Sequence, residues 1–349
     1  MRILHIAPHY GGGIAPAVVG IFESINASHS LIEIEKTKDA ASLGLLSSNK
    51  LLPVNINEIR NDSGFKFDND LVIFHFWESS GWHKLAKFDF RFRTNGSVLL
   101  NHQSFSHNGY KVLQISHLFK SIVQSGYSGH QVPSEWTIIP TCNNRISPKS
   151  NKFQIVPRAI YLGTLAYKKI DRNFFKIASK LNSQGVSLDI YGHVSDTKFS
   201  EDLKTHISTS IVFQGYTSNS VQILTNYTYF FYPLRTDHYG TSENSLLEAM
   251  SQGLIPLVND NPAERKILGK DLMKVLEIKK SIECKNSLLF HDKDLIRTIS
   301  TLVESRAQKL TDVVPRKLAW KLVLDKSTFI TTEINLSTLA QQMVSLINT

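Results

Sequence analysis

Short apolar runs alternate with helix-like segments along the first half of the chain, and this alternation predicts its secondary structure. We expect buried strands at 3–7, 71–76, 98–100, 112–115 and 138–139, and helices at 14–25, 81–88 and 118–125. Such βαβα alternation is typical of a parallel sheet that helices cover on both faces.

The same pattern restarts after about residue 156. Strands are predicted at 159–162, 188–191, 211–213, 229–232 and 254–258, and Ile170, Phe174, Ala178 and Leu181 follow helical spacing. The stretch 145–151 is rich in linker residues. We therefore expect an α/β protein with two doubly wound domains, 1–155 and 156–332. Apolar residues at 336, 339, 343 and 346 predict an amphipathic helix within 333–346.

Composition narrows the functional classes. The 349 residues carry a net charge of +9 without a dense basic run, so nucleic acid is not an expected partner. The mild charge leaves contact with anionic lipid or phosphate-bearing substrates open, beside simple solubility. Cys142 and Cys284 are too few for a disulfide scaffold or a four-cysteine zinc site. The absence of a long apolar run or a secretory signal predicts a soluble protein of a reducing compartment.

Residues at predicted strand ends are candidates for ligand contact in the first half. Gly11–Gly13 follows the first strand, and such a turn either brings backbone N–H groups to a ligand or is only a tight connection. His75 and His102 lie at or near strand ends, where a histidine can hydrogen-bond a sugar hydroxyl or a phosphate. Trp77 can stack on a sugar ring or cap the core. The D-x-D stretch 68–70 precedes a strand, so we interpret it as a solvated turn rather than a metal site.

The second half holds a denser set of polar residues. The pair at 168–169, two lysines after the first strand, is placed to meet a diphosphate or consists of surface charges. The stretch 235–253 predicts a polar loop and then a helix, whose free N–H groups favour an anionic phosphate. Glu248 lies in an apolar part of that helix and needs a partner, such as ribose hydroxyls. Ser245 and Glu248 also have capping-box spacing, which would explain Glu248 without a ligand. Glu264, on the next loop, is another carboxylate at a strand end.

Taken in order, these segments resemble glycosyltransferase family 4, a retaining family of the group 1 type with the GT-B fold. Residues 243–258 resemble its donor-site signature, and residues 163–169 resemble its Gly-Arg-Leu-x-x-x-Lys-Gly turn. Residues 139–143 resemble the Ile-Pro-Asn-Gly segment that closes the first domain. The resemblance implies two Rossmann-like domains whose parallel sheets face each other across a cleft. It also implies that a helix at about 333–349 packs back on the first domain.

The resemblance implies a function and a set of site residues as well. The implied reaction is sugar transfer from a nucleoside-diphosphate sugar to a saccharide or lipid-linked saccharide, in bacterial surface polysaccharide (lipopolysaccharide or capsule) biosynthesis. The implied enzyme is cytoplasmic, touches the anionic inner face of the cell membrane, and needs no metal or other cofactor. The implied catalytic residues are His102, Lys169 and Glu243. The implied donor-binding residues are Gly12, Gly13, Thr164, Lys168, Lys169, Tyr216, Tyr239, Gly240, Glu243, Asn244, Ser245 and Glu248, and the candidates for acceptor binding are His75, Trp77 and His107.

The resemblance also implies a role for each matching residue of this chain. Lys169 and the N–H groups of 244–245 would hold the diphosphate, Glu248 the ribose, and Glu243 and His102 would touch the donor sugar. The leaving diphosphate gains charge in the transition state, so fixed positive groups lower the barrier.

The chain departs from the family pattern at two positions. Thr164 stands where the family has its diphosphate arginine, and Gly240 stands where it has its first carboxylate. Glu243 or Asp237 would then supply that carboxylate, and we prefer Glu243 because it is nearer the helix start.

Other classes stay open on the sequence alone. A nucleotide-sugar 2-epimerase of the same fold would use His102, Glu243 and Asp237 as acid/base groups and would convert the donor without an acceptor. Thr164 in place of arginine also fits a non-catalytic nucleotide-sugar-binding protein. A nicotinamide dehydrogenase would rest on the Gly11–Gly13 turn alone.

Overall fold

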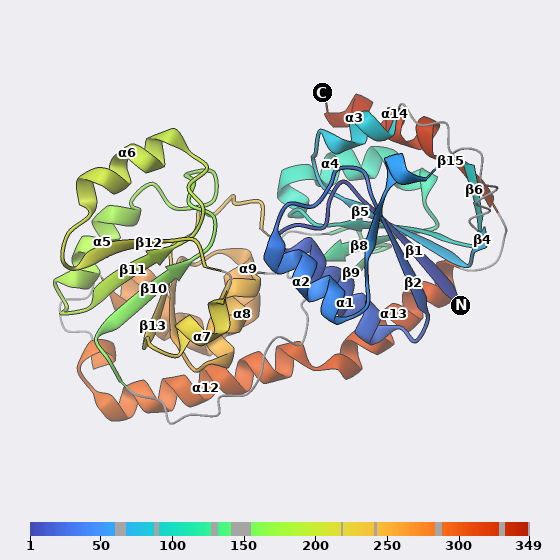
Figure 1. Cartoon of the computed structure of the whole chain (residues 1–349). Helices are drawn as coiled ribbons and strands as arrows, with labels where there is room; N and C mark the ends of the chain where they lie inside the picture. Colours follow the sequence, from blue (N-terminus) through green and yellow to red (C-terminus); the bar gives the residue numbers. More distant parts are fainter. Residues whose placement is uncertain are drawn as a thin grey trace. The chain divides into compact units, whose positions relative to one another are not determined.

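The computed structural model describes residues 1–59, 68–86, 91–126, 132–140, 155–217, 219–240, 243–282, 288–327 and 332–347 (Figure 1). The chain divides into two compact units. The first unit comprises residues 1–143 and 312–349, and the second comprises residues 144–311. The sequence-based domains ended at residues 155 and 332. In the structure, the first unit takes back the chain already at residue 312, so it contains the last two helices.

A seven-stranded parallel sheet forms the centre of the first unit, in the order β3-β2-β1-β5-β7-β8-β9. Its strands are β1 (Arg2–Ala7), β2 (Ser28–Glu33), β3 (Pro53–Asn55), β5 (Leu71–Phe76), β7 (Ser97–Asn101), β8 (Ser121–Ser125) and β9 (Thr137–Ile139). The chain runs from β1 outward to β3 and then from β5 outward to β9. The direction of winding therefore reverses between β1 and β5, which is where open α/β sheets bind ligands.

Helices cover both faces of this sheet. They are α1 (Ile14–Ser24), α2 (Ala40–Ser48), η1 (Ile56–Glu58), α3 (Gly81–Leu85), α4 (Phe105–Ile115), η2 (Ser116–Leu118), α13 (Val313–Ser327) and α14 (Leu336–Ile347). On one face Ile73 packs with Ile21 of α1 and Trp320 of α13. On the other face Phe74 packs with Met343 of α14. A small sheet, in the order β15-β6-β4, joins β4 (Asp68–Asn69), β6 (Arg91–Thr94) and β15 (Thr332–Asn335).

Several sequence-based assignments in the first unit are wrong. The predicted strand at 112–115 is the end of α4: Val112 and Ile115 are buried at helical i, i+3 spacing. The predicted helix at 118–125 is instead the end of η2 followed by β8. Short apolar runs do not distinguish a buried strand from a buried helix by periodicity. The D-x-D stretch begins with β4 rather than a turn, and residues 333–335 belong to β15, so α14 starts only at Leu336.

The second unit is built on a five-stranded parallel sheet in the order β12-β11-β10-β13-β14. Its strands are β10 (Arg158–Leu162), β11 (Ser187–Tyr191), β12 (Ile211–Gly215), β13 (Tyr229–Tyr232) and β14 (Ile255–Val258). Its helices are α5 (Phe174–Asn182), α6 (Thr197–His206), α7 (Ser220–Leu224), α8 (Asn244–Ser251), α9 (Pro262–Leu268), α10 (Lys270–Leu276), α11 (Ile278–Ser281), η3 (Leu288–Phe290) and α12 (Lys293–Thr311). The five predicted strands are confirmed within two residues, while Ile170 precedes α5 rather than lying in it. Here the winding reverses between β10 and β13.

Both sheets together confirm the predicted doubly wound α/β architecture. Across the described ranges, no helix is both long and apolar enough to cross a bilayer.

Candidate functional site

A buried ion pair joins the loops that follow β10 and β13, the two strands at the switch point of the second sheet. Lys169 Nζ lies 3.4 Å from Glu243 Oε2 and 5.4 Å from the centre of the Tyr232 ring. The Tyr232 hydroxyl donates to the same carboxylate oxygen across 2.5 Å. Only 1% of the Glu243 side chain is exposed, against 15% of Lys169. The lysine is thus the partner that keeps access to solvent.

His238 and Glu264 extend this pair into a cluster of alternating charge. His238 Nδ1 lies 3.6 Å from Glu243 Oε1, and His238 Nε2 lies 3.3 Å from Glu264 Oε1, in the first turn of α9. The Gly240 N–H donates to His238 Nδ1 across 3.1 Å. A neutral ring that accepts on Nδ1 carries its proton on Nε2, facing Glu264. We name Lys169, Glu243, His238 and Glu264 the charged cluster.

The charged cluster sets the protonation of its members. Burial raises the pKa of Glu243, but the charges of Lys169 and His238 outweigh it and hold that pKa below its usual value. Burial lowers the pKa of His238, but the nearby carboxylates of Glu264 and Glu243 reverse that effect, so its pKa is raised. Glu243 is therefore ionised at neutral pH although it is buried.

The backbone of Glu243 explains how its carboxylate reaches this position. Glu243 is the N-cap of α8, with the left-handed angles φ 38° and ψ 54°, which are rare outside glycine and asparagine. A Cβ added to Gly240 would lie 1.9 Å from Glu243 Oε1. The Glu243 carboxylate therefore occupies the space where a side chain at position 240 would begin. That is the position at which the family pattern expects its first carboxylate.

The start of α8 presents unpaired polar groups. Within the described part of the chain, the buried Oδ1 of Asn244 has no hydrogen-bond partner, and the N–H groups of Asn244 and Ser245 have no acceptor. Such a helix start favours an anion through its N–H groups and its dipole. The capping-box interpretation is wrong, because Glu243 is the N-cap and Ser245 already lies inside the helix. Glu248 accepts a hydrogen bond from Ser220 Oγ across 2.9 Å, at the start of α7.

Lys168 and its neighbours lie on the rim of these loops. Lys168 is exposed, and its Nζ lies 5.7 Å from the centre of the Tyr239 ring. The Thr164 carbonyl accepts from the Tyr161 hydroxyl across 2.9 Å, so the backbone at the expected arginine position is held by the core of the unit.

The other carboxylate candidate lies outside the charged cluster. Asp237 is 68% exposed and forms an ion pair with Arg235 at 2.6 Å. Tyr216, which follows β12, is 64% exposed. Burial and contacts thus set Glu243 apart from Asp237, although 1% exposure leaves little of Glu243 to touch a donor sugar directly. This geometry favours a role for Glu243 in positioning Lys169.

In the first unit, a carboxylate of the same unit, that of Asp39, binds the glycine turn after β1. Gly12 has φ +60°, and its N–H donates to Asp39 Oδ2 across 3.2 Å. Gly13 is the N-cap of α1. The amide that was expected to approach a phosphate is therefore held by the Asp39 carboxylate.

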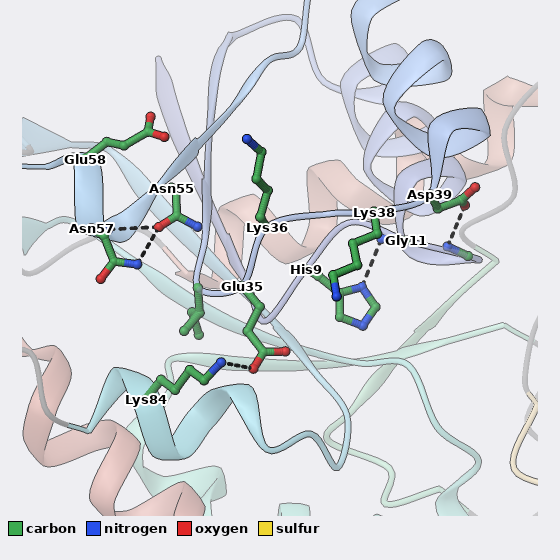
Figure 2. A pocket seen from close by; sticks show the side chains of 12 residues that line it. His9, Gly11, Glu35, Lys36, Lys38, Asp39, Asn55, Asn57, Glu58 and Lys84 are labelled. Carbon is green, nitrogen blue, oxygen red and sulfur yellow. Dashed lines mark hydrogen bonds and ion pairs between the residues drawn. The ribbon is translucent and has the colours of Figure 1, made fainter.

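A cavity of about 930 Å³ opens beside this turn, at the carboxyl ends of β1, β2 and β3. Three lysines, three carboxylates and two asparagines are among its lining residues (Figure 2). Lys84 pairs with Glu35 at 2.7 Å, and His9 Nδ1 accepts from the Gly11 N–H at 3.0 Å. Lys36 is exposed. The cavity wall thus alternates donors and acceptors, the arrangement that polyhydroxylated ligands use.

The candidates for acceptor binding lie elsewhere. His75 is fully buried and its two ring nitrogens bond His5 and His102, each at 2.9 Å, so direct contact with an acceptor does not fit. Trp77 contacts the His102 ring edge-on, with 6.3 Å between ring centres. His107 lies 3.7 Å from Glu78. None of these three lines the cavity.

The sequence did not indicate His238 or Tyr232 as members of a site. Tyr232 ends β13, and His238 lies in the loop that follows it. Because β13 lies beside β10 in the sheet, this loop meets the loop of Lys169, and knowledge of the strand order would have indicated both residues. Among the described residues, no group of three or more His, Cys, Asp or Glu is arranged to hold a metal ion.

Comparisons with known proteins identify a family for part of the chain and the fold of the whole. Residues 143–284 match the family described as glycosyl transferases group 1. None of the curated proteins is a significant sequence match. The chain is similar in fold to Anabaena Alr3699/HepE in complex with UDP and glucose, with a TM-score of 0.67, 11% identity, and coverage of 93% of this chain and 99% of that one.

Two further structures share the fold. The pneumococcal O-GlcNAc transferase GtfA, in complex with UDP and GlcNAc, has a TM-score of 0.54 at 16% identity, covering 73% of this chain and 56% of that one. The DNA modifying enzyme beta-glucosyltransferase has a TM-score of 0.54 at 12% identity, covering 93% of this chain and 100% of that one. The charged cluster lies within the matched residues 143–284. The second unit therefore carries a group 1 glycosyltransferase domain, and the chain is a glycosyltransferase with the GT-B fold.

Proposed function

We propose that the protein transfers a sugar, with retention of configuration, from a uridine diphosphate sugar to a saccharide acceptor. The observation that carries the proposal is the charged cluster beside the start of α8, within the segment that matches the glycosyltransferase family. We choose uridine as the nucleoside because HepE and GtfA were both solved with UDP.

The donor diphosphate binds where positive groups converge. Lys169 supplies an ammonium that Glu243 holds in place, and the N–H groups of Asn244 and Ser245 supply the helix start. Both bind the leaving diphosphate more strongly as its charge grows in the transition state. Glu248, which faces α7 through Ser220, holds the ribose hydroxyls. His102, in the first unit, contacts the donor sugar, and no separate base is required because the leaving phosphate accepts the proton of the attacking hydroxyl.

The acceptor binds in the cavity beside β1, β2 and β3 of the first unit. Its mixed lysine, carboxylate and asparagine lining matches the hydroxyl groups of a saccharide better than it matches a lipid chain. The proposed product is a bacterial surface polysaccharide. The net charge of +9 would draw the enzyme to the anionic membrane that carries lipid-linked acceptors. Co-sedimentation with anionic and with neutral vesicles tests this attraction.

The test is an assay of the purified protein with a panel of nucleotide-sugars, with and without oligosaccharide acceptors. We expect turnover of one UDP-sugar, and proton NMR of the product to show the anomeric configuration of the donor. Conversion of the donor sugar without any acceptor would instead show an epimerase. Binding of UDP-sugars without turnover under any condition would show a non-catalytic binding protein, and inversion at the anomeric carbon would refute retention.

A further inference from the structure

A file of four histidines crosses the sheet of the first unit on the face that α1 and α13 cover. His29, His5 and His75 lie on the adjacent strands β2, β1 and β5, and His102 directly follows β7. His29 Nδ1 meets His5 Nε2, His5 Nδ1 meets His75 Nε2, and His75 Nδ1 meets His102 Nε2, each at 2.9 Å. At the outer end, His29 Nε2 lies 3.2 Å from the Ile25 carbonyl oxygen, just past α1. We name these residues the histidine file.

The protons of the histidine file can be counted. A carbonyl oxygen only accepts, so His29 must place its proton on Nε2 and leave Nδ1 as an acceptor. His5 must then donate from Nε2, which leaves its own Nδ1 to accept from His75. The same step repeats once more, so His102 donates from Nε2 to His75. Four neutral rings carry four ring N–H protons. Three of them lie in the contacts between rings, and the fourth lies in the contact between His29 and the Ile25 carbonyl.

We propose that the Ile25 carbonyl fixes the direction of the histidine file, and that the file holds His102 as the neutral Nε2–H tautomer with its lone pair on Nδ1. His29, His5 and His75 are positioning residues for His102. Of these three, only His75 was a candidate for the glycosyltransferase site, as an acceptor contact that its burial does not fit.

Burial agrees with a file of neutral rings. Both His5 and His75 are fully buried, and burial lowers the pKa of each well below its usual value. Burial likewise lowers the pKa of His29, and that of His102 to about 3. An added proton on any inner ring would also bring two N–H groups face to face and break one contact. Geometry and burial therefore both oppose a charge on His5 and His75, while at His102 the opposing effect is burial.

The tautomer decides which hydrogen bond His102 can make. Its Nδ1 accepts a hydrogen bond from a hydroxyl and cannot donate one. This consequence rests on the proposed function: a sugar hydroxyl that reaches His102 Nδ1 must be the donor. The tautomer itself does not depend on any substrate.

Nitrogen-15 NMR of protein labelled at histidine tests the proposal directly, because pyrrole-like and pyridine-like ring nitrogens have separate shifts. In the wild-type protein we expect His102, His75, His5 and His29 all to show Nε2–H. A protonated ring, or Nδ1–H at His102, would overturn the proposal. Assignment uses single His→Gln variants.

Two substitutions at the partly exposed His29 test the direction. His29→Leu removes the acceptor of His5 Nε2–H, so we expect the file to reverse and His102 to show Nδ1–H. His29→Gln can still accept from His5 and donate to Ile25, so it should keep the wild-type pattern. The exposed His117→Gln is the control, with the wild-type pattern expected. If His29→Leu folds with an unchanged His102 tautomer, the anchor role is wrong. If it does not fold, the His29→Gln pattern decides, because Nδ1–H at His102 in that variant overturns the proposal and Nε2–H supports it.

Kinetics separate this proposal from the proposed function. Once a donor is found, His29→Leu should lower kcat by about tenfold, the worth of one hydrogen bond, with unchanged UDP affinity, and His29→Gln should restore it. Absence of any transferase activity would refute the proposed function and leave the NMR result standing. Full kcat in a His29→Leu protein with a reversed file would show that the tautomer has no part in the reaction.

Discussion

The histidine file and the charged cluster bury titratable side chains at equivalent places, the switch points of two parallel sheets, and arrive at opposite charge states. In the file, the hydrogen bonds join each ring to another ring or to the Ile25 carbonyl, so burial lowers each histidine pKa and the chain of hydrogen bonds stays neutral. In the charged cluster, Lys169 lies beside Glu243, and His238 lies between Glu243 and Glu264. There the carboxylate pKa falls and the histidine pKa rises.

Burial therefore does not decide the charge of a group; the nearest partner does. A neutral, directional file suits a contact that must accept or donate on a fixed atom. An ionised pair with one partly exposed cation suits the grip of a charged phosphate. The predictions below aim at the difference between these two arrangements.

The largest expected effect is at Glu243. Glu243→Gln keeps the shape but leaves Lys169 and His238 without their shared counter-charge. Breaking a buried pair costs about 3 kcal/mol of unfolding free energy, and we expect transferase activity to fall by about 100-fold or more because Lys169 is no longer held. Chemical denaturation and the assay above measure the two effects.

Asp237→Asn, in the same loop, is the matched control. Its carboxylate is exposed and pairs only with Arg235 among the described residues, so the unfolding free energy should change by less than about 0.5 kcal/mol. Equal effects of the two substitutions would show that the charged cluster does not have the role assigned to it.

Removing the middle of the histidine file should come next. His75→Leu leaves His5 and His102 each without one ring partner inside the core. We expect a loss of about 2 kcal/mol, the cost of unsatisfied buried polar groups, seen as faster hydrogen exchange in β1 and β5. Exchange in α8 should not change. His117→Leu, on the surface, should leave all three elements unaffected, and a similarly small effect of His75→Leu would contradict the file.

The two regions should respond to pH in opposite directions. The folded pKa values of His5, His75 and His102 lie below the unfolded value of 6.5. Their contribution to the free energy of unfolding is therefore complete above that pH and is lost as pH falls. The folded pKa of His238 lies above 6.5, so its contribution is complete below that pH and is lost as pH rises through the folded value. Each histidine contributes a slope of up to about 1.4 kcal/mol per pH unit.

Hydrogen exchange between about pH 5 and pH 8, corrected for the intrinsic rates, measures these slopes unit by unit. Protection in β1 and β5 should increase with pH, and protection in α8 should decrease. The contribution of Glu243, whose pKa is lowered, is lost only below its unfolded value of 4.5, so it does not confuse this range. If protection changed with pH in the same direction in both units, the opposite charge states assigned to the histidine file and the charged cluster would be contradicted.

The smallest expected effect is at Gly240. A Cβ there would lie 1.9 Å from Glu243 Oε1, so Gly240→Ala must displace the carboxylate, at a cost of about 1–2 kcal/mol. Gly44→Ala in α2 is the control, since nothing lies within 4 Å of its added Cβ and alanine favours the helix. Thermal unfolding should show a lower midpoint for Gly240→Ala only.

The sequence predicted most of what depends on local pattern. The five strands of the second sheet are apolar runs that end in glycine, proline or asparagine, and the helix after Glu243 has a clear periodic face. Val112 and Ile115 were misassigned because four apolar-rich residues fit a strand as well as a helical turn. The start of α8 at Glu243 depends on a left-handed backbone that no propensity favours for glutamate.

The sites were harder to predict because they depend on strand order. The members of the histidine file are separated by 24, 70 and 27 residues along the chain in the order in which they bond. Only the order β2-β1-β5-β7 and the strand register bring them into line. The resemblance placed Lys169 and Glu243 in one site, but His238 entered only through the geometry.

Isothermal titration of UDP into the wild-type protein, Lys169→Ala and Lys176→Ala tests the central claim, that the second unit grips a diphosphate beside the start of α8. Lys176 is exposed on α5 and serves as a charge-matched control. We predict binding to the wild-type protein and to Lys176→Ala with equal affinity, and binding to Lys169→Ala weaker by about tenfold or more. Equal affinity for all three proteins, or no binding of UDP to the wild-type protein, would contradict the account.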